Sequence, residues 1–181
     1  MKLFKIILFT IFMSNVIQAQ KFAPVESESK IKFTIKNFGL TVDGTFSGVK
    51  GSILFDGKNV EKSEISLSVN SGSVNTNNKE RDKHLKKVDY FDVEKYPSIS
   101  FTSTKIVKKI GANKYQVNGN LTMKGITKAV EFETIITSEN SKLSLKGTLE
   151  INRRNFKVGG NSMVLSDNVK LNFLINTKLE N

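Results

Sequence analysis

Apolar and polar residues alternate with a period of two along most of this chain, and this pattern excludes most architectures at once. Successive side chains on a β-strand point to opposite faces, so the alternation predicts strands with one buried and one solvated face. Strands are predicted over Lys30–Lys36, Thr41–Phe55, Lys62–Val69, Ser98–Val107, Tyr115–Met123, Val130–Ile136, Leu143–Ile151 and Val169–Ile175. About eight strands joined by short turns predict an all-β, antiparallel fold rather than a parallel α/β sheet.

Glycines interrupt the longest of these segments at Gly44, Gly48 and Gly51. Glycine inside a strand usually marks a bulge or a sharp bend, the devices that curl a sheet. A closed barrel of about eight strands is the size that can enclose one small ligand. The pattern therefore favours a single barrel, with a β-sandwich as the alternative. The dipeptide Asp56-Gly57 predicts a tight hairpin turn.

Helical spacing replaces the alternation once, near residues 78–90. Leu85, Val88 and Phe91 are spaced three apart, so they are predicted to share one face of a short helix that is turned towards the interior. Asn77 or Asn78 is the expected N-cap. The basic residues predicted to face solvent are Arg81, Lys83, Lys86 and Lys87.

The N-terminus has the features of a secretory signal peptide. Lys2 and Lys5 precede an apolar run over Ile6–Met13, and small residues follow up to Ala19. The apolar run is shorter than the ~20 residues that a membrane span needs. We therefore predict a signal peptide over residues 1–19, cleavage before Gln20, and one domain over residues 20–181 that is periplasmic or secreted.

The basic charge of the chain does not identify a partner. The formal charge of +11 becomes +9 when Lys2 and Lys5 are removed with the signal peptide. Such a balance suits nucleic acid, anionic lipid or an acidic cell surface, but the lysines are scattered rather than clustered. We expect no nucleic-acid partner, and the pattern leaves open a transient contact with a membrane surface and either a monomer or a homodimer.

The inventory of reactive residues predicts no metal, no cofactor and no catalytic residue. The chain has no cysteine and a single histidine, His84, which cannot build a usual zinc site. We expect His84 to be structural, with its ring hydrogen-bonded to a loop carbonyl or a carboxylate. An enzyme that uses His84 with Asp82 or Asp89 is an alternative. The acids expected to form solvated ion pairs with neighbouring lysines are Asp82, Asp89, Asp92 and Glu94.

Phenylalanine is abundant and tryptophan is absent. Most phenylalanines fall on the buried phase of the alternation, where they can fill a core or line a cavity. Composition does not separate these two roles. The pair Arg153-Arg154 can either bind an anionic headgroup through bidentate hydrogen bonds or straddle the two faces of a strand end.

Several ordered motifs resemble the YceI-like family, whose members are secreted or periplasmic lipocalin-like barrels that hold polyisoprenoid or other long-chain lipids. The resemblance spans nearly the whole predicted domain. It rests on Asp82-Lys-His84-Leu85, Asp89-Tyr-Phe91-Asp92, Tyr96-Pro97-x-Ile99-x-Phe101, Gly119-x-Leu121-Thr122-x-x-Gly125 and Ile151-x-Arg153. The chain departs from the family at Lys124, where many members have histidine.

The resemblance implies an antiparallel barrel with an apolar tunnel, capped in part by the helical segment and holding a long-chain isoprenoid or similar lipid. The predicted ligand contacts are Phe33, Phe38, Phe46, Phe55, His84, Leu85, Phe91, Phe101, Leu121, Phe132, Arg153, Phe156 and Phe173. The resemblance supports a lipid-binding protein that is not an enzyme. An interaction module, with its barrel filled by side chains and its basic surface as the active face, is the second hypothesis.

Overall fold

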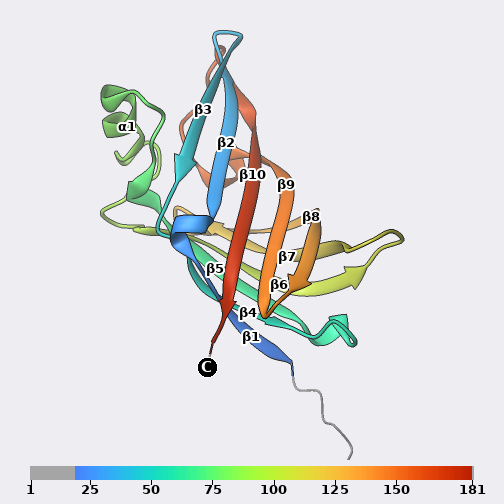
Figure 1. Ribbon diagram of the computed structural model, residues 1–181. Helices are drawn as coiled ribbons and strands as arrows, with labels where there is room; N and C mark the ends of the chain where they lie inside the picture. Colours follow the sequence, from blue (N-terminus) through green and yellow to red (C-terminus); the bar gives the residue numbers. More distant parts are fainter. Residues whose placement is uncertain (1–18, 181) are drawn as a thin grey trace, which may run out of the picture.

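The computed structural model describes residues 19–180 and shows a sheet of ten strands with one short helix beside it (Figure 1). The strands are β1 (Gln20–Pro24), β2 (Lys30–Asn37), β3 (Leu40–Phe46), β4 (Lys50–Phe55), β5 (Glu64–Asn70), β6 (Ser98–Lys108), β7 (Lys114–Met123), β8 (Ile126–Glu139), β9 (Lys142–Asn152) and β10 (Leu165–Leu179). The helix is α1 (Lys79–Leu85), and short 3-10 turns are η1 (Glu26–Glu28), η2 (Val60–Lys62), η3 (Ser71–Ser73) and η4 (Arg153–Phe156). The predicted signal peptide falls on residues 1–19, of which residues 1–18 lie outside the described part.

Strand β10 closes the sheet into a barrel. One edge of β10 pairs with β9, and the other edge pairs first with β2 and then, from Thr177 to Leu179, with β1. Strand β1 also pairs with β4, and β2 pairs with β3, so β1 and β2 share one position around the barrel and β3 and β4 share the next. All pairings are antiparallel. The predicted antiparallel barrel of about eight strands is therefore confirmed.

Two features of the closure were not predicted. The alternation does not indicate β1, which is short and ends at a proline, although Phe22 within it is almost fully buried. The single strand predicted over residues 41–55 is wrong, because the chain breaks between β3 and β4. Gly48 and Gly51 lie at this break with positive φ angles, as expected for glycines at a bend. Gly44, in contrast, lies in a regular ladder opposite Phe33.

The barrel is incompletely paired at one end. Strand β8 pairs with β9 only from Thr134 onwards, so the first half of β8 and the second half of β9 diverge. The turn η4 contacts both β8 and β10, and its Phe156 is almost fully buried. On the other side, β3 is joined to the segment before α1 only by a bridge between Thr45 and Asn75. This end of the barrel is therefore built from the inserted segments rather than from strands alone, as Figure 1 shows for α1.

The helical segment differs from its prediction in its length. Asn78 is the N-cap, and its side chain accepts a hydrogen bond from the Arg81 backbone N–H, as predicted. The helix ends at Leu85, however, and Val88 is 65% exposed, so the expected face of three apolar residues does not form. Phe91 instead folds back in a series of turns, in which its backbone N–H donates to the Leu85 carbonyl. Short-range turn hydrogen bonds, not helical periodicity, bring Phe91 beside Leu85.

The connection between β4 and β5 is longer than the predicted two-residue hairpin. The Asp56 carboxylate accepts hydrogen bonds from the backbone N–H groups of Lys58 and Asn59, which organises an eight-residue loop that contains η2. The hydrogen bond from the Asn59 backbone is the main cause that lowers the pKa of Asp56. A lowered folded-state pKa means that this carboxylate stabilises the loop above its unfolded pKa and stops doing so as the pH falls through the folded value.

Within residues 19–180, no helix has the length and apolarity needed to cross a bilayer.

Several phenylalanine rings lie flat on a glycine of the neighbouring strand. A Cβ built on Gly44 would lie 2.2 Å from the Phe33 ring, one on Gly119 would lie 2.4 Å from Phe101, and one on Gly147 would lie 2.5 Å from Phe173. No side chain other than hydrogen fits beneath these rings. The glycines thus let three large rings lie along the barrel wall instead of projecting across its interior.

We predict that Gly119→Ala lowers the free energy of unfolding by about 1–3 kcal/mol, because the added methyl would lie 2.5 Å from the Thr102 carbonyl oxygen as well as against Phe101. Urea unfolding measures the difference. Gly160→Ala is the control, since no atom lies within 4 Å of the position that its added methyl would take and its φ is not positive. Equal stability of the two variants would contradict the tight packing at Gly119.

Candidate functional site

A cavity of about 470 Å³ lies at the incompletely paired end of the barrel. Its walls come from β2, β3, β10, one residue each of β7 and β9, and η4 with the loop that follows it. The segment over residues 76–91, which contains α1 and which we call the α1 segment, forms the remaining side. The lining residues are Phe33, Ile35, Asn37, Val42, Phe46, Thr76, Glu80, Arg81, His84, Leu85, Tyr90, Phe91, Met123, Ile151, Arg153, Val158, Ser162, Val164, Leu165, Val169 and Leu171. We call this space the outer cavity.

A second cavity of about 140 Å³ lies within the barrel itself. Its lining is Ile31, Phe46, Ile65, Leu67, Ser68, Val69, Ile99, Ser100, Phe101, Leu121, Met123, Phe132, Leu145, Leu149, Leu171, Phe173 and Ile175. We call it the inner cavity. Phe46, Met123 and Leu171 line both cavities, so the two spaces are separated by side chains and not by backbone. The interior therefore contains space that the side chains leave unfilled.

Aromatic rings pack against one another along both walls. In the outer cavity, Phe46 contacts Phe33 and Phe91 with ring centroids 5.5 and 5.4 Å apart. In the inner cavity, Phe132 contacts both Phe101 and Phe173 at 5.4 Å. Tilted and edge-on ring pairs at these distances are favourable beyond the burial of their surface. The rings therefore support one another, and the walls can keep their shape without filling the space between them.

The polar lining residues are concentrated in the outer cavity, on the side of the α1 segment. The Arg81 guanidinium donates to the Thr76 hydroxyl oxygen at 2.7 Å and to the Thr76 carbonyl at 2.9 Å. Asp82 accepts hydrogen bonds from the Thr76 backbone N–H and hydroxyl at 2.8 and 2.6 Å. These bonds fasten α1 to the strand-like segment before it. Arg81 thus lies along the cavity wall, and its predicted orientation towards solvent was wrong.

Most of the predicted contact residues do line the two cavities. Phe33, Phe46, His84, Leu85, Phe91 and Arg153 line the outer cavity, and Phe46, Phe101, Leu121, Phe132 and Phe173 line the inner one. Three predicted residues lie elsewhere. Phe38 is 74% exposed in the β2–β3 turn, Phe55 packs edge-on against Tyr115, and Phe156 is buried within η4.

Arg153 stabilises the wall of the outer cavity through backbone carbonyls. Its guanidinium is almost fully buried, and all five of its N–H donors are used. The acceptors are the carbonyl oxygens of Val158, Gly160, Leu165 and Ser166 and the carboxylate of Asp167. No donor is left for a headgroup. Arg153 therefore holds the loop over residues 157–166 in place. The guanidinium of Arg154, in contrast, is half exposed and lies 3.4 Å from the Asp167 carboxylate.

His84 and its acidic neighbours do not form the interactions that the sequence suggested. The His84 ring packs edge-on against Tyr90 at 5.0 Å and, in the part of the chain that the structure describes, makes no side-chain hydrogen bond. Across residues 19–180, none of Asp82, Asp89, Asp92 and Glu94 lies within ion-pair distance of a lysine or arginine. The predicted ion pairs were wrong. Asp82 instead bonds to Thr76, as described above.

Lys124, where the sequence departs from the YceI-like pattern, lies outside both cavities. It occupies the β7–β8 turn with a positive φ, and its ammonium donates to the Lys157 carbonyl at 2.7 Å. It borders a shallow hollow that it shares with His84 and Tyr90, which also line the outer cavity. The extra positive charge is therefore near the outer cavity without being in it.

Several aliphatic residues at the centre of the site are not among the predicted contacts. Met123 and Leu171 line both cavities, and Ile35, Val42 and Val169 line the outer one. Their signal was present, because most of them lie in the same phase of the alternation as the predicted phenylalanines. The phase identifies an inward-facing residue, but it does not show which part of the interior is empty.

A closed antiparallel barrel with an apolar interior and one end completed by inserted segments defines a lipocalin-like binding protein. The family model for the YceI-like domain matches residues 22–177, and the chain belongs to this family. The relatives include a UPF0312 protein of Yersinia enterocolitica, 40% identical over 112 residues. That match covers 61% of this chain and 57% of the relative, so the chain aligns with little more than half of the relative's length.

Solved structures show the same fold. BcnA of Burkholderia cenocepacia superposes with a TM-score of 0.79 at 24% identity, over 84% of this chain and 98% of that chain. A polyisoprenoid binding domain from Saccharophagus degradans superposes with a TM-score of 0.70 at 14% identity, over 88% of this chain and 98% of that one. At these identities the likeness concerns the fold alone.

We predict that Arg153→Lys lowers the free energy of unfolding by about 2–4 kcal/mol, because a lysine cannot satisfy the buried carbonyls that the guanidinium fork reaches. Denaturant unfolding gives this difference, and hydrogen exchange should show faster exchange over residues 157–166. Arg154→Lys is the matched control and should change stability by no more than about 0.5 kcal/mol. Similar losses in both variants would mean that the buried hydrogen bonds are not the cause.

Proposed function

We propose that this protein holds one long-chain amphiphilic lipid of the isoprenoid type, with its chain running from the outer into the inner cavity. The observation that carries the proposal is that Phe46, Met123 and Leu171 line both spaces. Rotation of these side chains, without movement of the backbone, would join the two cavities. An elongated, branched hydrocarbon suits the resulting path better than a compact ligand does.

The energetics of such binding require only burial of the chain. Each buried CH₂ contributes about 0.8 kcal/mol, so a tail of a few isoprene units would contribute on the order of 10 kcal/mol before ordering costs. The inner cavity is lined by apolar side chains except at Ser68 and Ser100. A cavity of this kind favours hydrocarbon over water.

The distribution of polar residues supports one orientation of the lipid. The side chains of Thr76, Glu80, Arg81 and His84 all line the outer cavity and none of them lines the inner one. The polar head of an amphiphile would therefore lie beside the α1 segment, and the tail would point into the barrel. The solved neighbour described as a polyisoprenoid binding domain is consistent with a lipid ligand of this class.

We further propose that the protein acts by binding and carries out no catalysis. His84 is exposed at the rim, and its contact is the Tyr90 ring rather than a nucleophile or a carboxylate. Among residues 19–180, no group of three or more His, Asp or Glu side chains converges in a way that would hold a metal ion. Sequestration or transport of a lipid needs neither.

We also propose that the protein is exported, to the periplasm or out of the cell, and reaches lipids by transient contact with a membrane. The barrel begins with β1 at Gln20, the residue that cleavage after Ala19 would leave first. Removal of residues 1–19 would thus keep every strand of the barrel intact.

Phe46→Trp tests the path between the cavities. The larger side chain at the wall that both cavities share is expected to reduce uptake of a prenyl lipid at least about tenfold by obstructing the tail. Native mass spectrometry of the protein incubated with the lipid measures the loaded fraction. Phe55→Trp makes the same change at a buried position outside both cavities and should load like the wild type. Undiminished loading of Phe46→Trp would exclude the proposed path.

The ligand class and the export are tested by two masses from one preparation. The protein expressed with its full N-terminus should have the intact mass of a chain that begins at Gln20. Under native conditions it should carry a discrete long-chain lipid that organic solvent extracts. A full-length mass would contradict cleavage, and a persistently empty protein that takes up no added prenyl lipid would contradict the proposed function.

A further inference from the structure

Four exposed apolar residues gather at one end of the barrel, next to the outer cavity. Phe38 and Leu40 lie in and beside the β2–β3 turn and are 74% and 73% exposed. Met163 is fully exposed and Val164 is 39% exposed. The Phe38 backbone N–H donates to the Val164 carbonyl at 2.9 Å, which joins the two segments. We call these four residues the apolar tip, and Figure 1 shows the β2–β3 turn as the outermost point of this end.

Phe38 is in an unfavourable position for a large apolar residue. Phe38 and Gly39 have φ angles of 50° and 76°, the pattern of a two-residue hairpin turn that favours Asn-Gly. A bulky residue in the left-handed region is strained, and its ring here is also exposed to water. Neither feature stabilises the fold. A strained and exposed phenylalanine motivates a functional hypothesis, because its burial against a partner surface would offset the cost of the strained backbone.

The apolar tip is continuous with the wall of the outer cavity. Asn37 precedes Phe38, Val42 follows Leu40 by two residues, and both line the cavity. Ser162 and Val164, on either side of Met163, line it too. A surface that covered the tip would therefore lie directly against the space in which we place the lipid.

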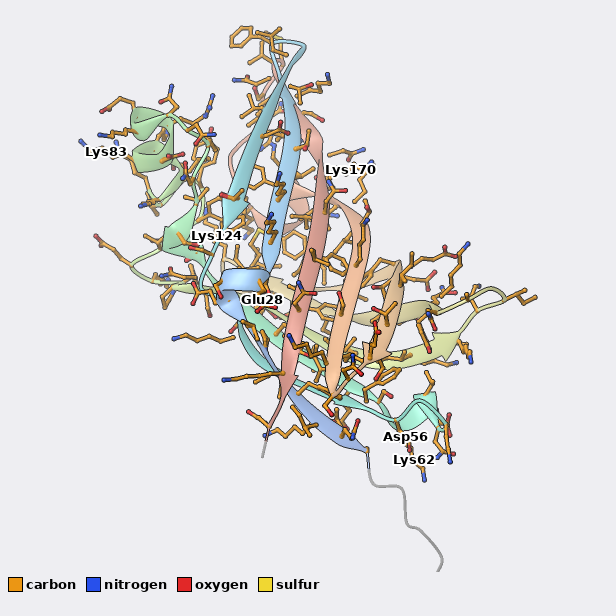
Figure 2. All side chains as sticks on the ribbon, in the orientation of Figure 1. Glu28, Asp56, Lys62, Lys83, Lys124 and Lys170 are labelled. Atoms are coloured by element: carbon orange, nitrogen blue, oxygen red, sulfur yellow. The ribbon has the colours of Figure 1, made fainter. Side chains whose placement is uncertain are left out.

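The charge of this end identifies the kind of surface. Residues 34–46 and 154–170, which form the tip-side parts of the strands and loop that carry it, contain four Lys and Arg residues against two Asp. Lys36 lies beside the turn, with its ammonium bonded to the Thr41 hydroxyl at 2.6 Å. Figure 2 shows Lys83 and Lys170 on the same half of the molecule. Exposed apolar residues on a segment with an excess of basic over acidic side chains match the interface of a bilayer with anionic headgroups.

We propose that the apolar tip inserts into the surface of an anionic lipid bilayer and brings the outer cavity against it. A long-chain lipid could then pass between bilayer and cavity without exposing its whole chain to water. This inference rests on the proposed lipid-binding function and adds to it the surface through which the lipid enters.

Flotation with vesicles of phosphatidylglycerol and phosphatidylcholine tests the proposal on the mature protein. The variant combines Phe38→Asn, Leu40→Thr and Met163→Ser, none of which lines either cavity. Asparagine suits the left-handed turn, so this variant should fold normally. We expect its partitioning onto the vesicles to fall about tenfold or more, and that of the wild type to fall at high salt or on pure phosphatidylcholine.

Ile110→Ser is the matched control, because Ile110 is also fully exposed in a hairpin turn but lines neither cavity and is not part of the apolar tip. It should bind vesicles like the wild type. Undiminished binding by the tip variant, or no vesicle binding by the wild type, would overturn the proposal. A tip-dependent dimer in sedimentation velocity, without vesicle binding, would also overturn it and identify a second copy as the occupant.

Native mass spectrometry of prenyl-lipid uptake from detergent separates this proposal from the proposed function. Normal loading of the tip variant together with lost vesicle binding supports the tip as the membrane contact. Normal loading with unchanged vesicle binding rejects the tip and leaves the function standing. Failure of the wild type itself to load lipid rejects the proposed function, and with it the inference that rests on it.

Discussion

One edge of β10 pairs with two different strands, and this pairing sets the shape of the whole barrel. Because β10 is 15 residues long, it pairs with β2 along one part of its edge and with β1 along another. Pairing with β1 closes the barrel at one end and satisfies the backbone groups that an open edge would expose. Beyond β1, the strands β2 and β3 continue outwards without closure. The outer cavity exists because inserted segments, and not strands, complete this second end.

The open interior depends on how the aromatic residues pack. A barrel of this size can be filled by its own side chains. Here Phe33, Phe101 and Phe173 lie flat over glycines of neighbouring strands, so their volume is taken up by the wall. Outside the strands, Arg153 also keeps the cavity wall in place, because its buried guanidinium donates hydrogen bonds to carbonyls of the loop over residues 157–166. The open interior thus depends on aromatic rings that pack over glycines and on one buried cation.

Local pattern predicts structure only where neighbouring residues control it. Alternation predicts most of the strands because side-chain direction has a period of two in any strand. It does not predict features whose partners are distant in the sequence. The short β1 is held by β4 and β10, Leu85 and Phe91 meet through turns, and Asp56 extends a loop that its dipeptide predicted to be tight. Arg153 illustrates the same limit. An arginine that binds a lipid headgroup and a buried arginine that holds a loop in place look the same in the sequence.

The class of fold, the inward-facing phase of each strand and the family of the chain can all be predicted from its sequence. They follow from residue-by-residue periodicity and from motifs at fixed spacing. The packing of distant strands, in contrast, sets which inward-facing residues border empty space. It also leaves Phe38 exposed at the tip, places Phe46 between two cavities and leaves Arg153 without a free donor. These properties depend on how side chains from distant strands fill a shared volume, and periodicity along one strand carries no information about that volume.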